Sequence, residues 1–261
     1  MNSSVLFVFF LSILLGVLRA ADLVFGTDAA TGLCIVGSVW WRYLALGIVV
    51  LAAVLLGRKA GRKAEVVRGR YPLAGVLAFA GAVCFLAAAA IQFAQGTAAV
   101  LGGSVRVILE CFCSAWLSTL GRCWLSPNDW KKPTGGLYLA VAGSLVFYWN
   151  VLLRFMENSS SWHRVAPTAA VWQELAALVF LAALARALYL PQPGNHKALC
   201  AAGLAAFALC LCWQLPRVAI LMTGLSWAAP AVWAEILAGL GLCCVGGIGG
   251  VCAVACAGGQ T

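Results

Sequence analysis

Long apolar stretches separated by short polar segments run through the whole chain, and they constrain its fold more than any other feature. A helix needs about 20 mainly apolar residues to cross the hydrocarbon core of a bilayer. Stretches of this kind occur at residues 5–18, 40–57, 73–94, 100–121, 136–155, 169–190, 198–216 and 231–255. The sequence therefore predicts an all-α fold, a polytopic bundle of about eight transmembrane helices.

The composition leaves no room for a soluble domain. Of the 261 residues, 64% are hydrophobic and 10% are charged, whereas a soluble domain carries about 25% charged residues. A water-soluble globule built from this chain would lack the polar side chains needed to cover its surface. We therefore expect one transmembrane domain over residues 1–261, with the lipid bilayer as its surroundings.

The first apolar stretch is short and allows two interpretations. It is followed by Arg19-Ala20-Ala21, which resembles the small-residue cleavage site of a secretory signal peptide. Signal peptides begin with positively charged residues, however, and Met1 to Ser4 include no basic side chain. We expect a retained helix; cleavage would leave seven spans, and the remaining spans would keep their orientation.

Basic residues indicate how the chain crosses the membrane. Eleven of the seventeen Lys and Arg residues fall in Arg58–Arg70, Arg122–Lys132 and Arg186–Lys197, three segments between alternate spans. Alternate loops share one side of the membrane, and basic loops remain in the cytoplasm. Both termini are then cytoplasmic, and we expect a cell membrane, the cytoplasmic membrane of a bacterium. Because this rule explains the net charge of +9, no nucleic acid partner is expected.

Short sequence similarities suggest that pairs of spans repeat. Leu56-Gly57-Arg58 recurs as Leu120-Gly121-Arg122, and residues 170–174 resemble residues 231–235. The matching pieces lie about 60 to 70 residues apart, at equivalent ends of the even-numbered spans. This spacing favours four related helical hairpins of the same orientation, an arrangement that occurs in some transporters.

Polar side chains gather in the outer halves of the predicted spans, whereas the inner halves contain mainly Ala, Leu, Val, Gly and Cys. Ionised groups inside a membrane need pairing or hydration. Arg106 and Glu110 are four residues apart, so they share a helix face and can pair. We therefore predict an outward-facing polar cup that binds a small ligand. Its predicted residues are Arg42, Arg106, Glu110, Asn150, Trp172, Glu174, Gln214, Arg217, Trp233 and Glu235.

Parts of this pattern have explanations that need no ligand. Arginines at span ends, such as Arg42 and Arg217, extend towards water, and tryptophans form belts at both membrane interfaces. The pair of Arg106 and Glu110 would in that case fix the packing of its helix. A binding cup requires instead that the polar groups of different spans point to the same place.

Cysteine and histidine patterns do not support a metal site, a cofactor or catalysis. Most of the twelve cysteines lie within apolar stretches, where free cysteine behaves as a small hydrophobic residue. The chain has no C-x-x-C spacing and no Cys/His cluster of the kind that binds zinc. His163 and His196 have no Ser, Cys or carboxylate arranged around them for catalysis. We therefore expect no metal, no cofactor and no enzymatic activity.

Two functions account for a multi-pass bundle with polar groups on one side. The first is a ligand-binding or sensory membrane module, which needs a separate cytoplasmic output protein because its own cytoplasmic loops are short. The alternative is a small-molecule transporter or permease subunit that works as a homo-oligomer. A transport path should offer polar contacts along its whole length, so the apolar inner halves favour the first function.

Overall fold

Local signals in the sequence set the ends of several helices. The Ser38 hydroxyl oxygen accepts a hydrogen bond from the Trp40 backbone N–H and caps the helix that begins there. Pro72 opens the next helix, where its missing N–H costs no hydrogen bond. That helix ends at Ala94 with Gln95 as its C-cap, and Gly96 follows with a φ of +68°, which glycine adopts without strain.

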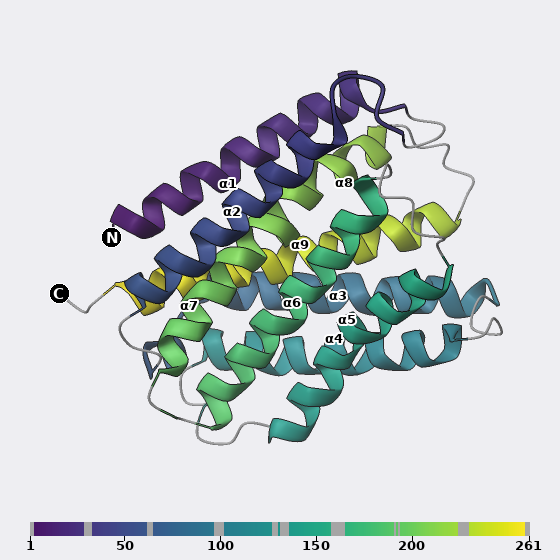
Figure 1. The fold of residues 1–261 in the computed structure, drawn as a ribbon. Helices are drawn as coiled ribbons and strands as arrows, with labels where there is room; N and C mark the ends of the chain where they lie inside the picture. The colour runs from purple at the N-terminus through teal and green to yellow at the C-terminus, as the bar shows by residue number, and fades with distance from the viewer. Residues whose placement is uncertain are drawn as a thin grey trace.

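The computed structural model describes residues 3–28, 33–61, 65–96, 102–126, 130, 136–157, 165–190, 192, 194–223 and 230–258. Its α-helices are α1 Ser3–Ala21, α2 Val39–Ala60, α3 Pro72–Ala94, α4 Gly103–Leu125, α5 Gly136–Glu157, α6 Val165–Tyr189, α7 Asn195–Ala206, α8 Gln214–Thr223 and α9 Pro230–Ala257 (Figure 1). The π-helical segments η1 Asp22–Gly26 and η5 Phe207–Trp213 extend α1 and join α7 to α8, and a short 3-10 turn, η2 Glu65–Arg68, precedes α3.

The prediction of an all-α membrane bundle is confirmed. In the described ranges the helices form eight rods, because α7, η5 and α8 continue as one, and no β-strand accompanies them. Seven rods are long and apolar enough to cross a membrane. The remaining rod, α4, has a sufficient length of 23 residues but carries Arg106, Glu110 and Arg122. It begins three residues later than predicted because Gly102, with a φ of +86°, precedes it.

Successive rods pack as antiparallel hairpins: α1 with α2, α3 with α4, α5 with α6, and the α7–η5–α8 rod with α9. The start of α1 and the end of α9 lie at the same end of the bundle (Figure 1). Helices α2, α4 and α6 also finish there, and they bring Arg58, Arg122 and Arg186 with them. We call this the basic end. The hairpins are as predicted, whereas their descent from one repeated unit stays a prediction.

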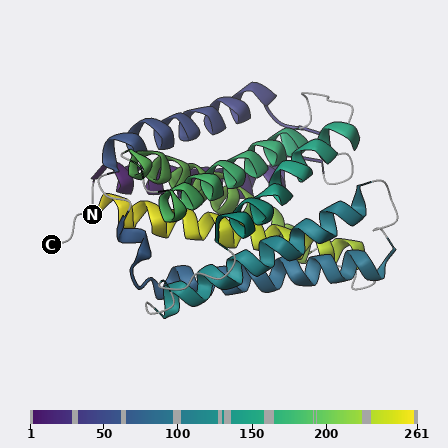
Figure 2. The same ribbon diagram turned by 90° about the horizontal axis from the view of Figure 1, so that it is seen from below.

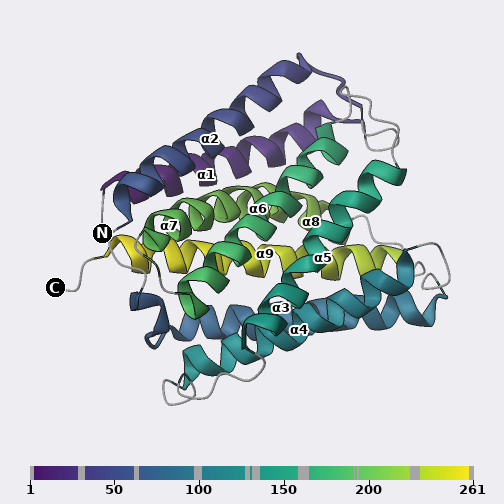
Figure 3. The same cartoon turned by 60° about the horizontal axis from the view of Figure 1, so that its bottom comes forward.

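Six of the rods enclose a common centre. Helix α3 packs on α4, α4 on α5, α5 on α6, and α6 on α7 and η5, while α9 closes the ring against η5, α8 and α3. Figures 2 and 3 show α9 in the middle of the molecule, with α3 and α4 on one side and the α1–α2 hairpin on the other. That hairpin contacts α7 and η5 from outside the ring.

The retention of residues 1–20 in the mature protein stays a prediction.

Glycines allow α9 to approach its neighbours at backbone distance. A Cβ atom at Gly203 of α7 would lie 2.5 Å from the carbonyl oxygen of Gly249 in α9. A Cβ atom at Gly246 would lie 2.6 Å from the backbone nitrogen of Leu211 in η5. Small residues serve this purpose in membrane proteins, where close van der Waals contact replaces the hydrophobic effect between helices.

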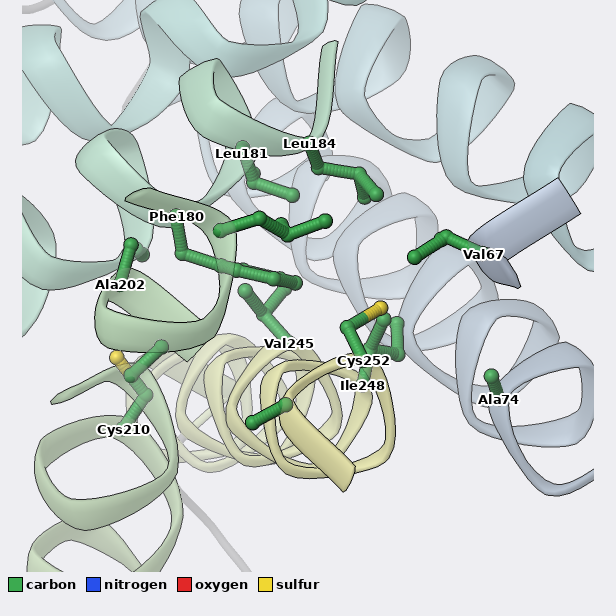
Figure 4. Close-up of a cluster of buried hydrophobic side chains, with 14 of the residues drawn as sticks. Val67, Ala74, Phe180, Leu181, Leu184, Ala202, Cys210, Val245, Ile248 and Cys252 are labelled. Carbon is green, nitrogen blue, oxygen red and sulfur yellow. The ribbon is translucent and has the colours of Figure 1, made fainter. Parts of the chain in front are cut away.

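Apolar side chains fill the ring towards the basic end. Figure 4 shows Phe180, Leu181 and Leu184 of α6 directed at Val245 and Ile248 of α9. All five are completely buried. These side chains therefore fill the space between α6 and α9 in this half of the bundle. They leave no polar path between the two helices at this point.

The packing of α7 on α9 predicts the effect of a single added methyl group. Gly203→Ala should lower the melting temperature of the purified protein in detergent by about 5 °C or more, because overpacking typically costs about 1 to 3 kcal/mol. Gly47→Ala is the matched control, since a Cβ atom there meets nothing within 4 Å. Equal melting temperatures for both variants would contradict the close approach of α7 and α9.

Candidate functional site

A cavity of about 360 Å³ lies within the ring, away from the basic end. Every rod of the ring contributes to its wall, and the α1–α2 hairpin does not. Its polar lining residues are Gln92, Gln95, Arg106, Glu110, Asn150, Arg154, Gln173, Glu174, Gln214, Arg217 and Glu235. Its apolar lining residues are Phe85, Phe147, Leu153, Ala231, Ala234, Ala238, Gly239 and Leu242.

Seven of the ten residues predicted to form a polar cup meet at this cavity. They come from five different rods, and they are Arg106, Glu110, Asn150, Glu174, Gln214, Arg217 and Glu235. Depth along each span was a sufficient guide for these residues because each lies in the half of its rod opposite the basic end.

The structure places the other three predicted residues elsewhere. Arg42 belongs to α2, outside the ring, where its guanidinium pairs with Asp22 and donates to the Gly26 carbonyl oxygen at 3.1 Å. Trp172 packs against a separate apolar cluster that α1, α2 and η5 share. Trp233 is half-buried but does not line the cavity. The aromatic lining residues in the described part are the phenylalanines Phe85 and Phe147, and neither predicted tryptophan is among them.

Several lining residues were not predicted, and helical spacing could have found some of them. Phe147 and Arg154 are three residues before and four residues after Asn150, so all three share one face of α5. Phe85 and Gln92 are seven residues apart and share a face of α3 in the same way. Gln95 follows the end of α3, where helical spacing no longer indicates direction.

Glu110 is the most deeply buried carboxylate of the cavity, with 1% of its side chain exposed. Arg106 donates from Nε to Glu110 Oε1 at 3.0 Å. The Gln92 amide nitrogen lies 3.2 Å from both carboxylate oxygens and donates from the neighbouring helix. One cation and one amide thus compensate the cost of burying this group away from water.

Two further arginine–glutamate pairs complete the charged lining. Arg154 of α5 lies 3.9 Å from Glu174 of α6, and the Asn150 amide nitrogen donates to the same carboxylate at 3.4 Å. Arg217 of α8 donates to Glu235 of α9. Each pair includes one positive and one negative group, so three cations face three anions around the cavity.

A pair of buried amides connects the cavity to the π-helical segment η5. The Gln173 amide nitrogen donates to Gln214 Oε1 at 2.9 Å and to the Leu209 carbonyl oxygen at 3.0 Å. Leu209 lies within η5. π-helical turns occur often at functional sites, and here the turn lies directly beside the wall of the cavity.

Aromatic rings form the floor of the cavity. Phe85 and Phe147 meet edge to face, with 5.9 Å between their ring centroids. Leu242 of α9 lies at the same level and separates the cavity from the buried Val245 one turn below. The cavity is therefore amphipathic: charged and amide groups line its sides, and apolar groups close it towards the basic end.

The lining offers groups that bind and orient a ligand. The lining residues in the described part include no Ser, Thr, Cys or His side chain. Comparison with known proteins adds no guide, because no protein-family model, no curated protein and no solved structure matches the chain. Function has to be inferred from the charges, amides and shape of the cavity itself.

The difference in burial predicts that the arginine–glutamate pairs differ in coupling free energy. Removing only the cation with Arg106→Gln should leave Glu110 buried without its charged partner, and Glu110→Gln should relieve that penalty. A double-mutant cycle on purified protein should give a coupling free energy of about 1 to 3 kcal/mol for this pair. Arg217 and Glu235, whose carboxylate side chain is 49% exposed, should couple by less than about 1 kcal/mol. A larger coupling free energy for Arg217 and Glu235 than for Arg106 and Glu110 would contradict the observed burial.

Proposed function

We propose that this multi-pass membrane protein is a ligand-binding, sensory membrane module whose ligand enters the cavity inside the helix ring. The observation that carries the proposal is the convergence of three arginine–glutamate pairs, from five rods, on one cavity. Structural ion pairs need no shared empty space between them, whereas a binding site does. A volume of about 360 Å³ also lies within the range typical of small-molecule sites.

The positive-inside rule supports an outward-facing cavity. Arg58, Lys59, Arg122, Arg186 and Lys197 all lie at the basic end, opposite the cavity. Basic segments beside membrane spans remain in the cytoplasm. In our proposal both termini are cytoplasmic, the membrane is a bacterial cytoplasmic membrane, and the cavity accepts its ligand from the outer side.

A sensory module needs a way to pass its signal on. The apolar helices contact the lipid bilayer, and α1 and α2 expose large apolar side chains such as Phe10 and Leu51 at their surface. The chain forms no separate soluble domain in our interpretation. We propose that a cytoplasmic output protein, or a second copy of the chain, reads the state of the bundle from the basic end.

A small-molecule transporter remains the second candidate. One observation favours it: the α7–η5–α8 rod changes from α- to π-helix beside the cavity, and interrupted helices line the substrate sites of many transporters. The apolar packing of Phe180, Leu184 and Val245 below the cavity favours the sensory module, because a transport path must open through it.

Filling the cavity tests binding directly. Ala238→Trp places a bulky side chain among the lining residues, and Leu51→Trp adds the same side chain on the exposed surface of α2. In a thermal-shift screen with small polar metabolites, at least one compound should raise the melting temperature of the parent protein and of Leu51→Trp. The Ala238→Trp variant should keep its ligand-free melting temperature within a few degrees, by the usual small effect of a tolerated substitution, and should lose the response.

The proposal fails if the best compound stabilises Ala238→Trp as strongly as the parent protein. Binding would then take place outside the cavity, and the arginine–glutamate pairs would serve packing alone. Uptake of such a compound into vesicles that contain the purified protein would support the transporter instead.

A further inference from the structure

We infer that the ligand carries a single negative charge, as a carboxylate or a phosphodiester, next to an apolar group. The inference rests on the proposed function and adds the chemical class of the ligand. Its anionic group would lie against Arg106, Arg154 and Arg217. Its apolar group would lie against Leu153, Ala231 and Ala238. Planar guanidinium groups suit carboxylates and phosphates because they offer several N–H donors in one plane.

The first argument is what the lining exposes. The side chains of Arg106, Arg154 and Arg217 are 32%, 34% and 31% exposed. Their partners Glu110 and Glu174 are only 1% and 9% exposed. The lining is formally neutral, but a molecule that enters it touches guanidinium groups far more than these two carboxylates.

The second argument is the supply of unused hydrogen-bond donors. The side chains of Arg106 and Arg217 each donate from one nitrogen to a glutamate, and in the described residues these side chains form no other hydrogen bond. Arg154 Nε and Gln95 Nε2 are buried without a partner in the same part of the chain. The corresponding unused acceptor is Asn150 Oδ1. Donors are in excess, so the missing partner is a group rich in acceptors.

The third argument sets the charge of the ligand at one. Among the lining carboxylates in the described part of the chain, only Glu235, at 49% exposure, stands open. It would repel part of a doubly charged group such as a phosphate monoester. A monoanion can contact the three arginines and leave Glu235 paired with Arg217. The lining also presents apolar groups at Leu153, Ala231 and Ala238, and these favour an organic anion over an inorganic one.

A carboxylate in solution and the phosphodiester of an anionic lipid share this chemistry. Both would approach from the membrane surface at which the cavity lies. The experiment therefore uses the full-length protein in nanodiscs of zwitterionic phosphatidylcholine, and a second preparation that includes phosphatidylglycerol. Phenylacetate is the anionic probe, and phenethylamine and 2-phenylethanol are a cationic and a neutral probe of similar size.

Phenylacetate should bind saturably, and the two other probes at least about tenfold more weakly, the ratio expected from one charged hydrogen bond. Arg154→Gln should weaken phenylacetate binding by about tenfold or more, and Arg154→Lys, which keeps the charge, should restore part of it. The control is Arg42→Gln, which removes a guanidinium outside the ring and should leave binding unchanged. Weaker phenylacetate binding with phosphatidylglycerol present identifies the lipid head group as the occupant; unchanged binding identifies a soluble anion.

Stronger binding of phenethylamine or 2-phenylethanol, abolished by Ala238→Trp, would overturn the anionic class and leave the proposed cavity intact. The absence of saturable phenylacetate binding up to about 10 mM, weaker than any functional affinity expected here, would also overturn it. Phenylacetate binding that Ala238→Trp does not reduce would overturn both the ligand class and the proposed function.

Discussion

The structure depends on one constraint: a charge buried at membrane depth must have a partner. The chain meets it by pairing each buried carboxylate with an arginine at the same depth, as Glu110 does with Arg106 and Glu174 with Arg154. The amide groups of Gln92 and Asn150 then donate to the remaining carboxylate oxygens, Glu110 Oε2 and Glu174 Oε2. Because the partners come from different rods in two of the three cavity pairs, pairing also decides which rods must be neighbours.

Each helical hairpin pairs a carboxylate with arginine at the end away from the basic loops. In the first hairpin Asp22 pairs with both Arg19 and Arg42, and the other three hairpins contribute Arg106–Glu110, Arg154–Glu174 and Arg217–Glu235. The first hairpin packs outside the ring, and Asp22 and Arg42 are not among the described residues that line the cavity of the ring. The other three hairpins form the ring and share the cavity. Pairing of a carboxylate with arginine thus occurs in all four hairpins. It serves packing in the first hairpin, and in the other three it lines a common cavity.

Depth could be predicted from the sequence, whereas rotation about each helix axis could not. Distance from the basic loops placed Glu110, Glu174 and Glu235 in the outer halves of their spans, because helical rise per residue is fixed. Trp172 lies in the outer half of its span too, but it is turned towards α1 and α2 while Glu174 faces the ring. Arg42 lies in the same outer half of its span, but it belongs to the α1–α2 hairpin, which packs outside the ring. Sequence alone does not order hairpins around a ring, since that order follows from contacts such as those of α9 with α3 and η5.

The most direct test of the account is the access of water-soluble reagents to two positions on one face of α9. Ala238 lines the cavity, and Val245, seven residues further along, is buried beneath its floor. A cysteine at position 238 should react with a membrane-impermeant thiol reagent added outside intact cells, above the baseline of the parent protein, and a cysteine at position 245 should not. Failure to label position 238 would contradict an outward-facing cavity, and equal labelling of both positions would contradict a closed floor.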